Sequence, residues 1–218
     1  MLKKYDNLLN LESTIAKELF ESVDHPWEVL PKIKEVIFTY IEELDDNYIK
    51  YSKNVYVHKD ANISDKATII GPCILGNSEV RPGAYIRGNA IIGDNCVIGN
   101  STEIKNAIIF NNVQLPHYNY VGDAVLGDHA HTGAGVILSN VKNDKSNVTV
   151  NDNGTKIETN LRKFSAIIGD NVDIGCNSVV CPGSIIYPDT KVYPLTMIRG
   201  IIGPSKIVKS MDNIIERR

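Results

Sequence analysis

The 218-residue sequence has no long apolar run, no paired-cysteine motif and no excess of charge of one sign. It contains 23 lysine and arginine residues against 26 aspartate and glutamate residues, so we do not expect a surface that binds nucleic acid. No stretch approaches the roughly 18 apolar residues that predict a membrane-spanning helix, and no sustained apolar segment opens the chain. We therefore expect a soluble, cytoplasmic protein with neither nucleic acid nor a membrane as its partner.

From residue 57 onward the sequence repeats a unit of about six residues, and aliphatic residues recur every 17 positions. One such column contains Leu75, Ile92, Ile109 and Leu126. Each block of 17 divides into six, six and five residues, so three short strands that meet at three corners would complete one triangular coil. This repetition is typical of a parallel β-helix whose aliphatic columns point inward.

The four cysteines form no Cys-x-x-Cys pair and no disulfide framework. Cys73 and Cys96 stand at the fifth position of a repeat, where a small buried residue is needed. We interpret them as reduced structural thiols.

Residues 1–50 differ from the repeats and predict a small helical segment before the β-helix. Its second helix is expected to start at Pro31, since proline is favoured in a first helical turn. We assign the β-helix to residues 51–203 and a C-terminal tail to residues 204–218.

The repeat is interrupted between residues 139 and 165 by a polar stretch. Within it, two short β-prone runs flank Asn153-Gly154, a dipeptide that favours a hairpin turn. We predict an inserted β arm that reaches out from the helix.

The spacing of His117 predicts a possible site for acyl transfer. Ala134 follows 17 residues later and lies between two glycines, so it should stack directly on His117 in the next coil. An imidazole base beside an accessible backbone N–H, which could hold an oxyanion, suits acyl transfer. Glu103 could hold the imidazole in one tautomer, and Asn140 could orient a substrate hydroxyl or carbonyl.

The run from residue 117 to 128, followed by residues 133–135 and Asn140, resembles the acetyltransferase half of the bacterial bifunctional N-acetylglucosamine-1-phosphate uridyltransferase. It is closer still to the corresponding half of archaeal sugar-1-phosphate nucleotidylyltransferases, which also have a longer arm. Arg81-Pro-Gly-Ala and Glu103-Ile-Lys105 match as well, and the similarity extends from residue 75 to about 195.

The resemblance implies an all-β fold, a left-handed β-helix of the hexapeptide-repeat acyltransferase family, with active sites between the subunits of a homotrimer. It implies acetyl-CoA as co-substrate and an amino-sugar 1-phosphate, of the glucosamine 1-phosphate type, as acceptor in nucleotide-sugar biosynthesis. About 50 helical residues take the place of the family's nucleotide-binding half, so nucleotidyl transfer is not expected from this chain.

The resemblance also implies roles for single residues. His117 would be the general base that takes a proton from the substrate amine, Glu103 would orient it, and Asn140 would contact the sugar beside it. The implied binding residues fall into two groups, one for the sugar phosphate and one for acetyl-CoA. The first group is Arg81, Lys105 and Tyr120, and the second is Ala134 and Cys176.

Two alternatives remain open. The first is a non-catalytic scaffold or regulatory protein related to UDP-N-acetylglucosamine pyrophosphorylases, favoured because His131 replaces a family asparagine and a lysine of the arm has no match. The second is a zinc site that uses His117, His129 and His131. Neither later histidine is offset from His117 by about 17, so a compact ligand set is not expected and we predict no metal.

Overall fold

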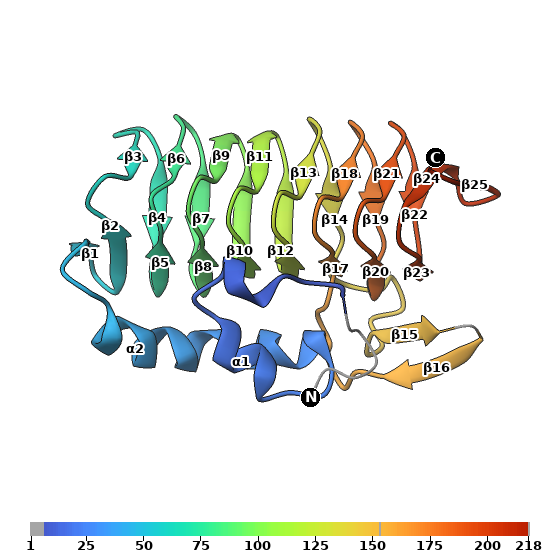
Figure 1. The fold of residues 1–218 in the computed structure, drawn as a ribbon, viewed down its shortest axis with the longest axis horizontal. Helices are drawn as coiled ribbons and strands as arrows, with labels where there is room; N and C mark the ends of the chain where they lie inside the picture. Colours follow the sequence, from blue (N-terminus) through green and yellow to red (C-terminus); the bar gives the residue numbers. More distant parts are fainter. Residues whose placement is uncertain (1–6, 153, 218) are drawn as a thin grey trace.

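The computed structural model describes residues 7–152 and 154–217, and its main body is a left-handed parallel β-helix (Figure 1). Three flat faces of short strands run along one axis, and each strand pairs in parallel with the strand one coil earlier. The predicted fold class is therefore confirmed.

The first face is the one that packs against the helical layer described below. Its strands are β2 (Val55–His58), β5 (Cys73–Leu75), β8 (Ala90–Ile92), the second halves of β10 (Glu103–Ile109) and β12 (Tyr120–Leu126), β17 (Ala166–Ile168), β20 (Ser184–Ile186) and β23 (Ile201–Ile202). The short strand β1 (Tyr48–Ser52) pairs antiparallel with β2 and closes the N-terminal end of this face.

The second face follows the first in every coil. Its strands are β3 (Asn62–Ile63), β6 (Glu79–Val80), β9 (Val97–Asn100), β11 (Gln114–His117), β13 (His131–Thr132), β18 (Asp173–Ile174), β21 (Lys191–Val192) and β24 (Lys206–Ser210). The antiparallel strand β25 (Asn213–Glu216) closes its C-terminal end.

The third face completes the coil and leads back to the first. Its strands are β4 (Thr68–Ile70), β7 (Tyr85–Arg87), the first halves of β10 and β12, β14 (Ile137–Leu138), β19 (Val179–Val180) and β22 (Met197–Ile198). The division of the chain at residues 50 and 203 stays a prediction, although β24 continues the second face beyond residue 203.

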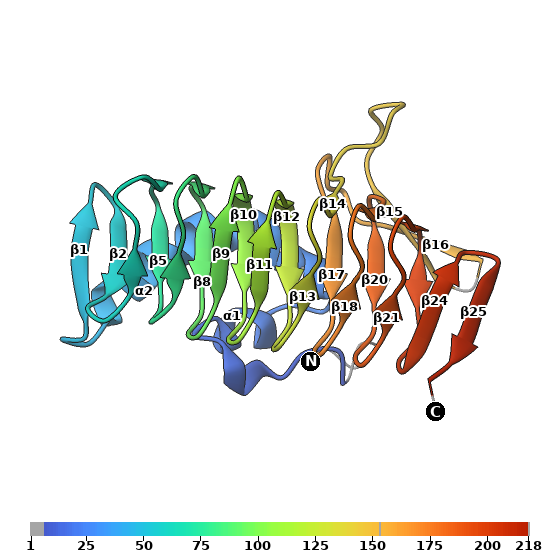
Figure 2. The same cartoon turned by 90° about the horizontal axis from the view of Figure 1, so that it is seen from above.

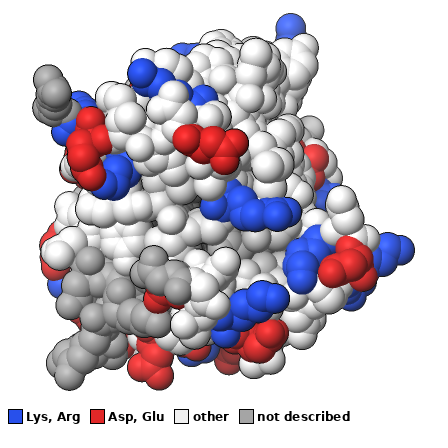
Figure 3. Space-filling view, turned by 90° about the vertical axis from the view of Figure 1, so that its right-hand side faces the viewer, with Lys and Arg blue, Asp and Glu red and all other residues white. Residues whose placement is uncertain are grey.

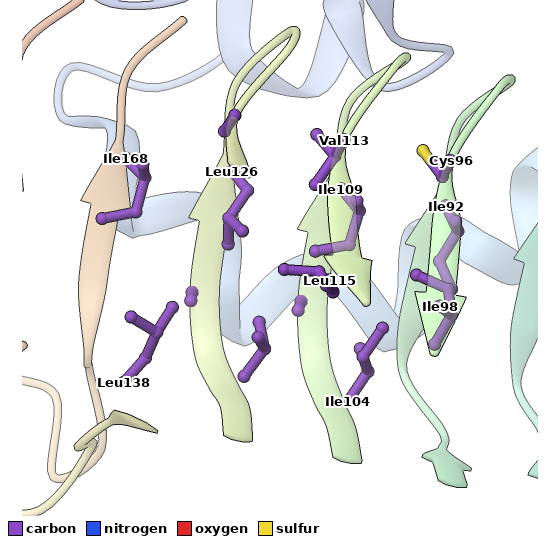
Figure 4. Packing of buried hydrophobic residues seen from close by; sticks show 14 of the residues in the cluster. Ile92, Cys96, Ile98, Ile104, Ile109, Val113, Leu115, Leu126, Leu138 and Ile168 are labelled. Carbon is purple, nitrogen blue, oxygen red and sulfur yellow. The ribbon is translucent and has the colours of Figure 1, made fainter. Parts of the chain in front are cut away.

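The aliphatic columns fill the interior, as the period of 17 predicts. Leu75, Ile92, Ile109 and Leu126 lie in register on successive strands and are at most 1% exposed. Figure 4 shows Ile92, Ile109 and Leu126 of this column pointing into the interior. Such ladders stabilise the coil because each one removes a continuous apolar strip from water.

Two cysteines belong to the same core. Cys73 and Cys96 are buried, and burial raises the pKa of each thiol to about 12. Both are protonated at neutral pH, in agreement with a structural role.

The helical segment lies as a layer along the first face (Figures 1 and 2). It consists of η1 (Leu11–Ser13), α1 (Lys17–Glu21), η2 (Pro26–Lys32) and α2 (Ile33–Glu43). Its buried side chains form one cluster with the outward side chains of the first face, among them Ile74, Ile91, Ile108 and Val125. These outward residues are completely buried, so the chain covers this face of its own β-helix.

The interruption at residues 139–165 contains the predicted hairpin, formed by β15 (Thr149–Asp152) and β16 (Thr155–Glu158). Asn153 of the predicted turn lies outside the described residues. The hairpin does not project freely as expected, because Val148 and Val150 are buried in the same cluster as Ile167 and Ile185 of the first face. The arm therefore continues the helical layer toward the C-terminal coils.

Charged side chains of both signs are interspersed on the C-terminal end of the molecule (Figure 3). Within residues 7–152 and 154–217, no helix is long and apolar enough to cross a membrane.

Candidate functional site

His117 lies at the end of β11, at the corner between the second and third faces, and its side chain is exposed. The Gly135 N–H donates a hydrogen bond to the His117 carbonyl over 3.2 Å, so the next coil stacks on this residue as expected. In the part of the chain that the structure describes, no side chain or backbone atom is hydrogen-bonded to the His117 imidazole. The ring is therefore free to contact a substrate.

Ala134 stands in the loop above His117, and its backbone conformation depends on the glycines beside it. A Cβ atom on Gly133 would lie 2.7 Å from the Cys176 nitrogen and 2.8 Å from Cys176 Sγ, and Gly135 has φ of +76°. The Ala134 carbonyl accepts from the Asn177 N–H at 2.8 Å, whereas no acceptor for the Ala134 N–H occurs among the described residues. Ala134 thus offers an unpaired donor at the same corner as His117, and the exposed Cys176 lies one coil further on.

Glu103 is not placed beside His117 within one chain. Its Oε1 instead forms an ion pair with Arg87 Nε at 3.1 Å, on the outward side of the third face. Glu103 lies in register with Tyr120 of the next coil, which is three residues beyond His117. The carboxylate therefore lies along the same face as the candidate base without contacting it.

Lys105, Tyr120 and Asn140 are brought together at the opposite end of the third face, where it turns into the first. Lys105 Nζ lies 3.3 Å from Asp123 Oδ2, and Asn140 Nδ2 donates to the same oxygen at 2.6 Å. Asn140 Nδ2 also lies 3.2 Å from the Tyr120 hydroxyl. Asn106 Nδ2 donates to Asp123 Oδ1 at 2.9 Å, so the buried carboxylate holds the whole group in place.

Arg81 is not part of this group. It forms two contacts with Glu79 on the second face, of 3.0 and 3.1 Å. The backbone N–H of Arg81 donates to the Ile98 carbonyl, and Ile98 pairs with Leu115 of the following coil. Arg81 therefore lies about 10 Å below Leu115 along the axis of the β-helix.

The two other histidines considered for a zinc site, His129 and His131, are each paired with an aspartate. His131 Nδ1 lies 2.8 Å from Asp173 Oδ1, and His129 Nδ1 lies 3.0 Å from Asp128 Oδ2. Among the described residues, no three potential metal ligands cluster.

Asp123 and Arg87 were not predicted from the sequence. The signal for Asp123 was present, because Asn106, Asp123 and Asn140 are each 17 residues apart and therefore stack at one corner. Arg87 stands in no motif that would have distinguished it from other surface arginines.

The β-helix of hexapeptide repeats is similar to the acetyltransferase half of bifunctional sugar-1-phosphate enzymes. The family model of the GMPPB C-terminal domain matches residues 69–161. The chain is 33% identical over 186 residues to the bifunctional protein GlmU of Methanococcus maripaludis strain C5, covering 84% of this chain and 45% of that protein. It is 31% identical over 167 residues to the bifunctional sugar-1-phosphate nucleotidylyltransferase/acetyltransferase of Sulfurisphaera tokodaii, covering 74% and 41%.

These matches confirm the resemblance to the acetyltransferase half of such bifunctional proteins. The chain spans less than half the length of these curated relatives. Among solved structures, it is similar to the acetyltransferase domain of PglB from Neisseria gonorrhoeae in complex with acetyl coenzyme A. That likeness has a TM-score of 0.39 and 14% identity, and it covers 75% of this chain and 57% of the other.

Proposed function

We propose that the chain transfers an acetyl group from acetyl-CoA to the amine of an amino-sugar 1-phosphate, of the glucosamine 1-phosphate type, in cytoplasmic nucleotide-sugar biosynthesis. The observation that carries this proposal is the unpaired His117 imidazole beneath the unpaired Ala134 N–H. The resemblance to sugar-1-phosphate acetyltransferases supports the same chemistry.

In the proposed reaction, His117 takes a proton from the neutral amine of the substrate as that amine attacks. The amine nitrogen then forms a bond to the thioester carbon, and the Ala134 N–H donates to the resulting oxyanion. Collapse of this intermediate breaks the carbon–sulfur bond, and the imidazolium returns a proton to the departing thiolate. A positioned base contributes on the order of 10²–10⁴ to the rate of such a step.

We propose that Tyr120 and Asn140 contact the sugar, since Asn140 contacts the Tyr120 hydroxyl and shares the Asp123 carboxylate with Lys105. Cys176 would lie beside the bound thioester, on the coil beyond Ala134. Arg81 stays a predicted phosphate contact, and Glu103 stays a predicted positioning residue for His117.

We further propose that the active form is a homotrimer. The first face is covered by the chain itself, which leaves the second and third faces for other copies. The third face exposes apolar side chains next to Tyr120, with Ile137 37%, Val179 38% and Met197 56% exposed. Light scattering should give a mass three times that of one chain.

The reaction is tested with purified protein, acetyl-CoA and a panel of amino-sugar 1-phosphates, with the released thiol measured by a colorimetric reagent. We expect release with glucosamine 1-phosphate or galactosamine 1-phosphate, and none with N-acetylglucosamine 1-phosphate, whose nitrogen is already acylated. Absence of release with every free amine would reject the proposal and leave a non-catalytic scaffold.

A further inference from the structure

The helical layer contacts the corner that holds Asn140 through a side chain of the β-helix. Asn106 Nδ2 donates to the Leu30 carbonyl of η2 at 3.3 Å and to Asp123 Oδ1 at 2.9 Å. An amide nitrogen has two hydrogens, so both bonds form at once. Asp123 Oδ2 in turn accepts from Asn140 Nδ2 at 2.6 Å. A chain of hydrogen bonds therefore connects the buried η2 to the amide that lies 3.2 Å from the Tyr120 hydroxyl.

A second connection reaches the backbone of Asn140 at the base of the arm. The Phe164 N–H donates to the Asn140 carbonyl at 3.0 Å. Phe164 is completely buried, and the centroid of its ring lies 5.9 Å from that of the buried Trp27 ring. Trp27 belongs to η2, as Leu30 does. One short element of the helical layer thus supports both the side chain and the backbone of Asn140.

The side-chain connection starts from a turn in the left-handed conformation. Asn106 has φ of +48° within β10, where the strand passes from the third face to the first. Glycine and asparagine adopt this conformation at low cost. Asn89, at the same corner one coil earlier, has φ of +50°, but within residues 7–152 and 154–217 its side chain makes no hydrogen bond. The two asparagines therefore form the same turn and differ in what their amides contact.

This corner is separate from that of the candidate base. Asn106 and Asn140 lie where the third face turns into the first, whereas His117 lies at the corner between the second and third faces. A change at Asn106 therefore acts on the candidate sugar contacts and leaves the imidazole in place.

We propose that the helical layer positions the acceptor contacts, and that Asn106 is the positioning residue through which it acts. Leu30 and Asp123 hold the Asn106 amide from two sides, and Asn106 sets the direction of the carboxylate that orients Asn140. The η2 element fixes Asn140 from the backbone side through Phe164. The inference rests on the proposed function, because Asn140 is a sugar contact only within that proposal.

Positioning of this kind affects binding of the acceptor more than the chemical step. A sugar contact that is equally strong in the ground state and the transition state lowers KM without raising kcat. Loss of the Asn106 amide leaves Asp123 Oδ1 without this donor, so the carboxylate can turn and Asn140 is no longer held toward Tyr120. The acetyl-CoA contacts at the other corner are unaffected.

Steady-state kinetics on the full chain test the proposal with Asn106→Gly, which keeps the left-handed turn and removes the amide. The matched control is Asn89→Gly. We expect the test variant to raise KM for the amino-sugar 1-phosphate at least about tenfold, with kcat and KM for acetyl-CoA within about twofold. The control should have the kinetic constants of the unaltered chain. An unchanged acceptor KM in Asn106→Gly would overturn the inference, and so would an equal rise in both variants or a loss confined to kcat.

Amide hydrogen exchange gives a readout that needs no turnover. In Trp27→Leu the helical layer loses the ring that packs on Phe164, so the Phe164 N–H should exchange at least about tenfold faster than in the unaltered chain. The Gly133 N–H, which donates to the Ile174 carbonyl at 2.7 Å, is the internal control and should keep its rate.

The two readouts separate the inference from the proposed function. If the unaltered chain acetylates no amine, the proposed function fails, and exchange at Phe164 then decides whether the helical layer holds Asn140. Normal acetyl transfer with unchanged exchange in Trp27→Leu and an unchanged acceptor KM in Asn106→Gly would reject the inference and leave the proposed function intact.

Discussion

The Asn140 side-chain amide donates a 2.6 Å hydrogen bond to the Asp123 carboxylate, one coil below it. The same carboxylate accepts from Asn106 another coil below, at 2.9 Å, so one buried acid joins three successive coils at one corner. The arm starts at this corner, and the candidate sugar contact Tyr120 lies beside it. The corner therefore links the stability of the β-helix to the geometry of the candidate site.

Replacing Asp123 with alanine should destabilise the protein. The substitution leaves the half-buried Lys105 ammonium and two side-chain amides without their acceptor, which costs about 3 kcal/mol. The free energy of unfolding is measured by urea denaturation. Asp65→Asn, at an exposed position in the first coil, is the control and should change little. A small loss for Asp123→Ala would mean that this carboxylate does not hold the corner together.

Ile91 and Ile137 both point outward from the β-helix, but only Ile91 is covered, because it lies under the helical layer. Ile91→Ala should lower the free energy of unfolding by about 2–4 kcal/mol, since it leaves a cavity between layer and helix. Ile137 is 37% exposed, so Ile137→Ala should lower the free energy of unfolding of the monomer by much less. Equal costs for both, measured in urea, would contradict the assignment of the first face as the covered one.

These two isoleucines show which features of the fold can be predicted from the sequence. The inward ladder from Leu75 to Leu126 is predictable, because side chains 17 residues apart must share one interior column. The covered face has a weaker signal: Ile91 stands next to the inward Ile92, and consecutive aliphatic residues are typical of strands buried on both sides. That pattern does not say what covers the strand.

The candidate site, too, was predictable from the sequence only in part. The stacking of Ala134 on His117 follows from the spacing alone, and so does the ladder through Asp123. The pairing of Arg87 with Glu103 does not, because the direction of a long side chain on an outer face depends on neighbours from another coil. The contact of Phe164 with Trp27 depends on how the arm folds back, which no repeat encodes.

Gly133 should be sensitive to the addition of one methyl group. In Gly133→Ala the new Cβ would lie 2.7 Å from the backbone nitrogen of Cys176, which cannot move aside cheaply. We expect a loss of about 1–3 kcal/mol in the free energy of unfolding, together with lower acetyl transfer as the Ala134 loop shifts. In Gly203→Ala the nearest atom would be 3.5 Å away, an ordinary contact, so this control should be close to neutral. If Gly133→Ala left the free energy of unfolding and acetyl transfer unchanged, the loop above His117 would not be tightly constrained.

Stability should depend on pH through Asp170. Burial, with a contribution from the nearby Asp128, raises the pKa of Asp170 to about 6, although it accepts N–H bonds from Asn10 and Asp128. The folded chain therefore binds this proton more tightly than the unfolded chain. The contribution of this group to stability is present below about pH 4 and is lost as the pH rises through about 6. As the pH rises through this window, the melting temperature of Asp170→Asn should fall less steeply than that of the unaltered chain. If the two proteins showed the same dependence of melting temperature on pH, Asp170 would not be its cause.

The most direct test of the proposed function is the initial rate of acetyl transfer by His117→Ala, measured beside His129→Ala. Both positions carry exposed histidines, but only His117 lies beneath Ala134. We expect His117→Ala to lose on the order of 10²–10⁴ in rate with its melting temperature unchanged, and His129→Ala to retain its rate. A His117→Ala protein that transfers acetyl groups as fast as the unaltered chain would contradict the account.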